Sequence, residues 1–102
     1  MDSNRIPVMI EMELPIPWPA ELVDAIPAQR KHTQRLLAEG TVRSYSVSAD
    51  RSKVWMVVVV ENANAAVDEL LADFPMRPYI DYRSEMLMFT NDASSVMHYS
   101  LN

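Results

Sequence analysis

The feature that most constrains the fold is a nearly continuous apolar run, KVWMVVVVE, from Lys53 to Glu61. Residues Val57 to Val60 are apolar at both parities, so both faces of this predicted strand must be covered. A strand in the middle of a sheet meets that requirement. The preceding stretch from Thr41 to Ser48, TVRSYSVS, predicts a second strand, and the ADRS between the two predicts a hairpin turn.

Two more strands are expected on either side of this hairpin. From Ile6 to Leu14, apolar residues alternate with Pro7, Met9, Glu11 and Glu13, which is the period of a strand with one face on a core. A last strand is expected at about Tyr79 to Phe89, after the segment FPMRPYID. In that segment Pro75 should end a helix, and Pro78 should begin an edge strand, where no neighbour needs its missing amide.

Two helices are expected between these strands. The first should begin at Pro19 and run to about Glu39, with Gly40, the single glycine of the chain, as a left-handed C-cap. Pro27 lies inside it and cannot donate to the carbonyl of Val23, so we expect a kink or two abutting helical pieces. The second should be short and capped by Asn62 or Asn64, with its apolar residues at helical spacing: Val67, Leu70, Leu71 and Phe74.

The order β-α-β-β-α-β predicts an α+β, ferredoxin-like fold with a four-stranded antiparallel sheet and both helices on one face. The first and third strands should be central. A length of 102 residues suits a single domain, residues 1–102, with a core at about 6–89 and a polar tail at 90–102. The helix-free face of so apolar a sheet needs a cover, so we expect a homodimer or a higher homo-oligomer built from dimers.

Composition argues against several classes of function. The absence of cysteine argues against disulfides and thiolate chemistry, and two distant histidines give little support to a metal site, so we expect no metal. A net charge of −5 with scattered basic residues argues against nucleic acid as a partner. The N-terminal stretch lacks a signal-peptide pattern and no window reaches membrane-span length, so we expect a cytoplasmic protein with no membrane contact.

A set of short motifs in a fixed order carries a family resemblance. These are MELPIP at 12–17, PAE at 19–21, the glycine that closes the first helix, DELL at 68–71 and FPMRPYID at 74–81. Together they resemble the muconolactone isomerase family, within the dimeric α+β barrel superfamily. The resemblance implies a sheet packed on a second sheet and chemistry without a cofactor. It also implies a proton shift on a small unsaturated lactone in the breakdown of aromatic compounds.

This chain carries only some of the site residues that the resemblance implies. Glu13 and Arg51 stand where the family carries an acid on the first strand and an arginine in the central hairpin. Met9 and Glu11 replace a histidine and an arginine, and residues 46–47, Ser-Val, replace a tryptophan and an arginine. Each lost arginine removes a group that grips a carboxylate. We therefore expect a substrate other than an anionic lactone.

The predicted site lies where the first strand ends and the fourth begins, because antiparallel neighbours bring those ends together. Glu13 is the candidate base and Tyr79 the candidate donor to a developing enolate oxygen. His32 is a third catalytic candidate, and Asp81, Arg51 and Trp18 are candidates for binding substrate. Each has an alternative reading: Glu13 as a strand-end residue paired to an arginine, His32 as a half-exposed surface residue, and Tyr79 with Asp81 as a subunit contact.

Three functions remain open on the sequence. The first is an isomerase that acts without a cofactor on a small unsaturated or aromatic-derived compound. The second is a non-catalytic domain for ligand binding or assembly on the same fold. The third is a cofactor-independent monooxygenase, another use of the same superfamily fold. The methionines on or beside the strands fit ordinary core filling. A pocket that combined them with Trp18, Trp55 and one or two carboxylates would suit a small neutral aromatic or lactone ligand.

Overall fold

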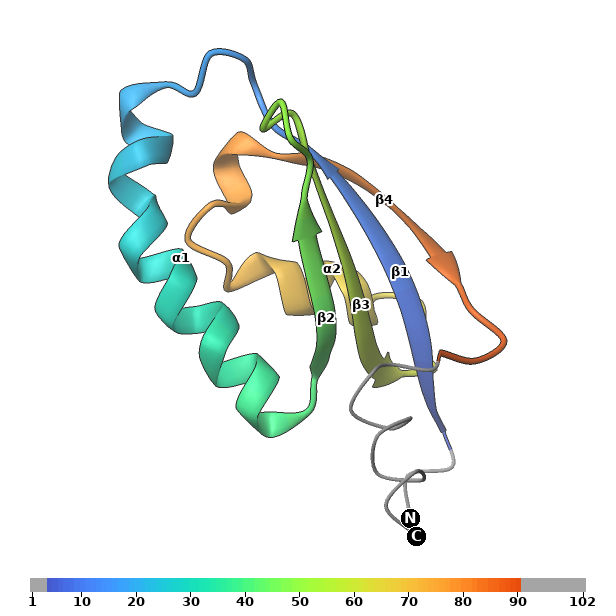
Figure 1. Cartoon of the computed structure of the whole chain (residues 1–102). Coiled ribbons are helices and arrows are strands. Elements are labelled where there is room, and N and C mark those ends of the chain that lie inside the picture. Colours follow the sequence, from blue (N-terminus) through green and yellow to red (C-terminus); the bar gives the residue numbers. More distant parts are fainter. Residues whose placement is uncertain (1–3, 91–102) are drawn as a thin grey trace, which may run out of the picture.

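A computed structural model describes residues 4–90 of the chain, so most of the predicted tail at 90–102 lies outside the described residues. The elements follow the predicted order (Figure 1): β1 (Arg5–Glu13), α1 (Ala20–Glu39), β2 (Val42–Val47), β3 (Lys53–Glu61), α2 (Ala66–Ala72), the 3-10 turn η1 (Arg77–Tyr79) and β4 (Asp81–Met86). The sheet is antiparallel with the strand order β2-β3-β1-β4. This is the expected ferredoxin-like α+β arrangement, with β1 and β3 in the centre.

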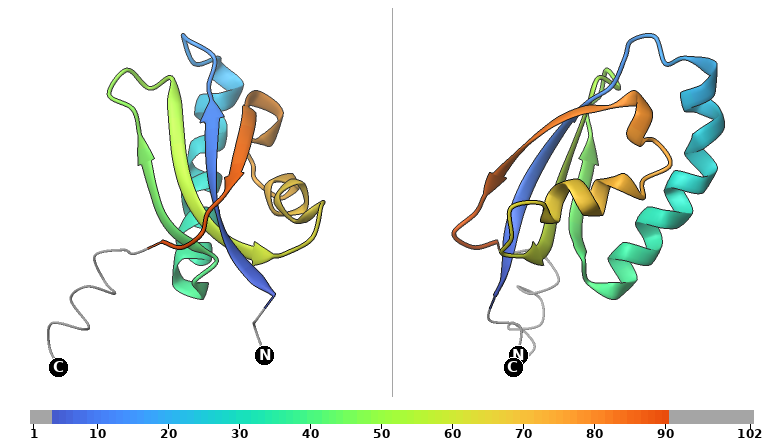
Figure 2. Two further views of the ribbon diagram at one scale, coloured as in Figure 1. Left: turned by 90° about the vertical axis from the view of Figure 1, so that its right-hand side faces the viewer. Right: turned by 180° about the vertical axis from the view of Figure 1, so that it is seen from behind.

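The molecule has two layers, because both helices pack on the same face of the sheet (Figure 2). The core forms between them from the residues of one strand parity, for example Ile10 opposite Met56 and Val8 opposite Val58. Leu71 and Phe74, at and just beyond the end of α2, are also buried there. The other parity of β1 and β3 faces away from the helices, and this helix-free face carries the groups discussed below.

Helix α1 begins and ends as its sequence predicts. Pro19 is the N-cap, and Gly40 is the C-cap with a φ of 85°, a left-handed conformation that glycine adopts without steric cost. The amide of Gly40 donates to Leu37 and that of Thr41 donates to Leu36, which satisfies carbonyls at the helix end. The helix runs through Pro27 as one continuous element, so the alternative of two abutting pieces is wrong.

The start of α2 differs from the expectation. Its N-cap is Ala65, which has no capping side chain, and neither Asn62 nor Asn64 takes that place. The amide of Asn62 instead donates to the carbonyl of Asn4, which extends the β1–β3 pairing beyond the end of β3. The chain needs a turn after that bond, with Ala66 donating to Ala63, before the helix can begin.

Strand β4 also starts later and ends earlier than expected, at Asp81 and Met86 rather than Tyr79 and Phe89. Residues Arg77–Tyr79 form a 3-10 turn, in which the amide of Tyr79 donates to Met76. Pro78 therefore lies in a turn and not at a strand start. Its fixed φ and missing amide suit the first turn of a helix as well as an edge strand. The sequence alone therefore does not decide between a turn and a strand start.

Candidate active site at the end of the sheet

A surface hollow of about 440 Å³ lies at the end of β1, and Glu13, Tyr79 and Asp81 all line it. Glu13 stands opposite Asp81 in the β1–β4 pairing and opposite Lys53 in the β1–β3 pairing. Lys53 lines the same hollow. The hollow therefore brings together three residues that the sequence analysis names as candidates, Glu13, Tyr79 and Asp81. Lys53 joins them.

The groups around this hollow have complementary chemistry. The carboxylate of Glu13 can accept a proton, and the phenol of Tyr79 can donate a hydrogen bond to an oxygen that becomes negative. Lys53 adds a cation to the lining, and its ammonium is 3.8 Å from the Glu11 carboxylate. Glu13 and Asp81 are exposed in the protomer, whereas Tyr79 and Lys53 are half-buried.

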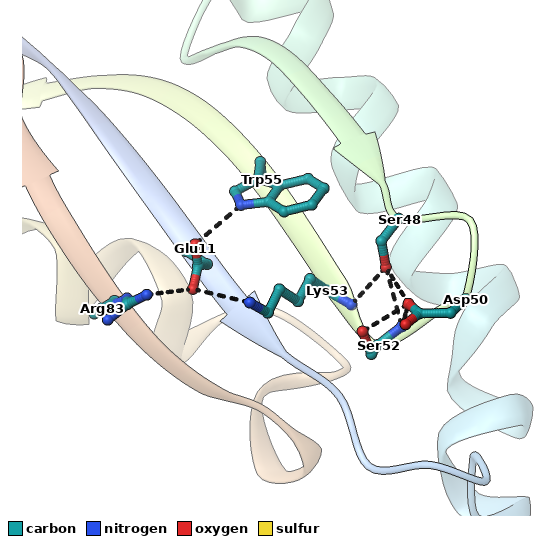
Figure 3. A network of polar contacts seen from close by, with 7 residues as sticks. All are labelled: Glu11, Ser48, Asp50, Ser52, Lys53, Trp55 and Arg83. Carbon is teal, nitrogen blue, oxygen red and sulfur yellow. Dashed lines mark hydrogen bonds and ion pairs between the residues drawn. The ribbon is translucent and has the colours of Figure 1, made fainter.

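A polar network centred on Glu11 lies in the middle of the helix-free face (Figure 3). The indole of Trp55 donates to one carboxylate oxygen of Glu11 at 3.0 Å, and Arg83 donates to the other at 2.8 Å. The ammonium of Lys53 is 3.8 Å from that second oxygen. The Trp55 hydrogen bond first, and then the Arg83 hydrogen bond, lower the pKa of Glu11.

This network changes the expected effect of Glu11 on an anionic ligand. Glu11 stands where the family resemblance implies an arginine, so its own carboxylate would be expected to repel an anionic ligand. In the structure its carboxylate contacts two cations, Lys53 and Arg83, and the three groups together carry a net positive charge. The carboxylate of Glu11 therefore does not leave the face negative at this point.

Trp18 and Arg51 contact each other away from the hollow. The indole of Trp18 donates to the backbone oxygen of Arg51 at 2.9 Å, and the guanidinium carbon of Arg51 lies 5.9 Å from the centre of the indole ring. Arg51 has a φ of 66° in the β2–β3 turn. Trp18 lines a second pocket, on the helix side of the sheet, and neither residue lines the hollow that holds Glu13.

His32 is not brought to the hollow. Its ring packs edge-on against Phe74 with 5.2 Å between ring centres, and its Nδ1 is 3.0 Å from Arg35 Nη2. The other ring nitrogen, Nε2, is buried without a hydrogen-bond partner. His32 does not line the hollow, so the structure gives it a packing position between α1 and the segment after α2 rather than a place beside Glu13.

The second pocket has a volume of about 260 Å³ and lies between α1, the segment after α2 and the sheet. Most of its lining is apolar, and the polar lining residues are Gln29, Arg30, Thr33 and Tyr45. The amide of Gln29 donates to Thr33, and its oxygen accepts from the backbone of Met76. Gln29 thus ties α1 to the segment that follows α2.

Residues 4–90 hold neither a clustered set of metal ligands nor a membrane-spanning helix. No group of three or more histidine, cysteine, aspartate or glutamate residues in this range is arranged to hold a metal ion. None of the helices in the same range has the length and apolar character needed to span a bilayer.

Comparison with known proteins gives the family. The profile of muconolactone delta-isomerase matches residues 7–89. The chain belongs to the muconolactone isomerase family. A solved structure of muconolactone isomerase superposes with a TM-score of 0.64 at 23% sequence identity, covering 85% of this chain and 99% of the other. A comparison with curated protein sequences found no match.

Membership of the muconolactone isomerase family agrees with the fold described above, and the match extends over β1 to the segment after β4. Two features of the site were missed from the sequence. Lys53 was assigned to a strand start, and its place beside Glu13 depends on the pairing of β1 with β3. The pocket behind Trp18 depends on how α1 packs on the sheet. Alternation of apolar residues signals neither feature.

Proposed function

We propose that the protein is an isomerase that moves a proton within a small unsaturated lactone or aromatic-derived compound. The observation that carries the proposal is the meeting of Glu13, Tyr79 and Lys53 at one hollow in a member of the muconolactone isomerase family. The reaction is neutral in redox terms, since the proton that leaves one carbon returns to another. A side chain that accepts and returns a proton is therefore sufficient, and the proposal requires no cofactor.

Glu13 is the proposed base. It removes a proton from the carbon next to a carbonyl group, and the electrons move into the carbonyl to form an enolate. Tyr79 donates a hydrogen bond to the enolate oxygen, and the ammonium of Lys53 offsets its negative charge. The protonated Glu13 then gives the proton to the far carbon of the conjugated system. Asp81, opposite Glu13, is proposed to hold a polar group of the substrate.

The proposed substrate carries no charge or little charge. Two carboxylates, Glu13 and Asp81, line the hollow with one lysine, so an anionic substrate would meet more negative than positive charge there. The chain as a whole has a net charge of −5. Arg51 and Trp18 lie outside this site and are not assigned a part in the proton transfer.

The test is proton exchange at carbon. A panel of neutral unsaturated lactones is incubated with the protein in deuterated water, and loss of the carbon-bound proton and formation of the isomer are followed by NMR. Replacing Glu13 by Gln keeps the shape and removes the base, so turnover should fall about a hundredfold or more. Glu61→Gln is the matched control. Like Glu13, Glu61 is exposed at the end of its strand, but it stands opposite Arg5 at the other end of the sheet.

The outcomes separate the candidate functions. Turnover that falls in Glu13→Gln and is unchanged in Glu61→Gln supports the proposal. Equal turnover in wild-type protein and Glu13→Gln contradicts it. A wild-type protein that exchanges no proton with any compound of the panel also contradicts it and favours the ligand-binding role. Oxygen consumption with a quinol would instead favour the monooxygenase.

A further inference from the structure

The segment FPMRPYID contains one cation, Arg77, to which the proposed function gives no part. Arg77 lies in the 3-10 turn η1 together with Tyr79, and Asp81 begins β4 just after that turn. The side chain of Arg77 is half-buried and does not line the hollow that holds Glu13. It is therefore not placed to contact a substrate in the hollow, and its contacts are with the protein itself.

The turn that carries Tyr79 is held only weakly by its own backbone. The amide of Tyr79 donates to Met76 at 3.0 Å, but the amide of Ile80 is 3.4 Å from the carbonyl of Arg77. Backbone hydrogen bonds usually measure roughly 2.7–3.2 Å. Pro78 has no amide to donate. Because a 3-10 turn also has poorer hydrogen-bond geometry than an α-helix, further contacts are needed to fix the position of Tyr79.

The guanidinium of Arg77 supplies two such contacts. Its Nη1 donates to the carbonyl of Ile80 at 3.1 Å. Its Cζ lies 5.1 Å from the centre of the Tyr82 ring, within the distance of about 6 Å at which an aromatic face attracts a cation. Ile80 and Tyr82 are the neighbours of Asp81 on either side. One side chain therefore joins the turn that carries Tyr79 to the strand that carries Asp81.

Both partners of Arg77 are anchored in the rest of the fold. The side chain of Ile80 is 5% exposed and belongs to the hydrophobic core. Tyr82 is half-buried against the same core and stands opposite Met12 in the β1–β4 pairing. Because these partners are fixed by packing and strand pairing, a cation that contacts both of them fixes the turn from which it projects.

We propose that Arg77 is a positioning residue, which holds the phenol of Tyr79 at the hollow that Glu13 and Asp81 also line. This role rests on the proposed function, in which Tyr79 donates a hydrogen bond to the enolate oxygen. Such a donor acts only when it lies about 2.7–3.1 Å from the place where the charge develops. Without the guanidinium the turn can move, and Tyr79 is at that distance less often. Loss of Arg77 should therefore lower kcat more than it changes KM.

Amide hydrogen exchange tests the contact without any substrate. Arg77→Met keeps a long side chain but removes the charge and the donors. It should raise the exchange rates of the Tyr79 and Ile80 amides about tenfold, whereas the rate at Val58, in the centre of the sheet, should change far less. Lys31→Met is the matched control, because it removes one positive charge from an exposed position on α1. It should leave both rates unchanged.

A double-mutant cycle tests whether Arg77 acts through Tyr79. Turnover of a lactone from the panel is measured for Arg77→Met, for Tyr79→Phe and for the variant with both changes. Tyr79→Phe should lower kcat about a hundredfold, and Arg77→Met about tenfold. In the Tyr79→Phe background, Arg77→Met should lower kcat no more than about twofold, because the group that it positions is gone.

Arg77→Lys is the conservative variant. Lysine keeps a cation that can lie over the Tyr82 ring and a donor for the carbonyl of Ile80. Its kcat should stay within about threefold of the wild-type value. If Arg77→Met does not fold, the exchange rates of Arg77→Lys and Tyr82→Leu test the same contact. They should be close to wild type in the first variant and raised in the second.

Faster exchange of Tyr79 and Ile80 in Arg77→Met but not in Lys31→Met supports the proposal. So does a loss of kcat that disappears in the Tyr79→Phe background. Unchanged exchange of both amides would overturn it. An equal loss of kcat with and without the Tyr79 phenol would also overturn it, because Arg77 would then have a general structural role.

The two proposals fail in different ways. If the wild-type protein turns over no compound of the panel, the proposed function is contradicted, and the exchange rates alone decide whether Arg77 holds the turn. If turnover is lost in Glu13→Gln but unchanged in Arg77→Met, the proposed function is supported and the positioning role of Arg77 is contradicted.

Discussion

At the scale of single residues, Asp50 is the clearest case of a side chain that shapes the structure around it. One of its carboxylate oxygens accepts hydrogen bonds from the Ser48 hydroxyl at 2.8 Å and from the Ser52 hydroxyl and amide at 2.7 and 3.0 Å (Figure 3). These bonds close the β2–β3 turn that gives Arg51 its left-handed backbone. The side-chain bond from Ser52 contributes most to lowering the pKa of Asp50, from 3.8 to about 2.

This pKa shift predicts a pH dependence of stability. Because the folded-state pKa of Asp50 is below its unfolded value, the stabilisation is fully present above pH 3.8 and is lost as the pH falls toward about 2. We expect the difference in unfolding free energy between the wild-type protein and Asp50→Asn to shrink through this window. Urea titrations at a series of pH values measure it. A difference that stays constant across the window would contradict the assignment.

Residues of the site differ in how far the sequence could place them. Glu13 and Asp81 could be brought together because an antiparallel pairing of β1 with β4 follows from the order of elements, and the observed register puts them opposite each other. His32 could not be placed in this way. Its position depends on the rotation of α1 about its axis, which is set by packing against Phe74 and not by any local pattern.

At the scale of elements, the predicted limits of helices and strands were correct where a residue type suits only one kind of position. Gly40 ends α1 because a left-handed C-cap favours glycine strongly, and β3 has the predicted limits because its apolar run is long. Pro78 was misplaced because proline suits two kinds of position. The N-cap of α2 was misplaced because a bond between Asn62 and Asn4 competes with capping, and such a long-range bond has no local signal.

Pro27 should lower the stability of α1. It is exposed inside α1, where it leaves the carbonyl of Val23 without its helical donor. In a helix interior, alanine is more favourable than proline by about 3 kcal/mol. Proline in turn adds up to about 1 kcal/mol to the free energy of unfolding, because it restricts the unfolded chain. Pro27→Ala should therefore raise the free energy of unfolding by about 2 kcal/mol, as measured by urea denaturation.

The control is Pro19→Ala. Pro19 is the N-cap, where no amide partner is missing, so this change should alter the free energy of unfolding by less than about 1 kcal/mol. A Pro27→Ala variant that is no more stable than the wild-type protein would contradict this prediction.

At the scale of the whole molecule, the question is what covers the helix-free face of the sheet. Val57 is buried there within the protomer, while Met9 and Val59 of the same parity are half-buried. The Glu11 network lies on this face and the hollow with Glu13 opens at its end. In a dimer in which two such faces pack together, the hollow would lie at the edge of the interface and lose water, which strengthens the electrostatic interactions needed for proton transfer.

A charge on this face should break the assembly. Val59→Glu would bury a carboxylate between the two sheets without a partner, so it should shift the protein to the monomer. Val23→Glu places the same charge at an exposed valine on α1 and should leave the assembly unchanged. Circular dichroism of both variants checks that the fold is kept.

We propose that the helix-free face is an interior face, shared by two copies of the chain. The most direct measurement is the molar mass in solution at micromolar concentration, by light scattering on a sizing column. The wild-type protein should have a mass of twice the 11.6 kDa protomer or a multiple of that value, and Val59→Glu should have the mass of one protomer. A wild-type protein that is a uniform 11.6 kDa monomer under these conditions would contradict it.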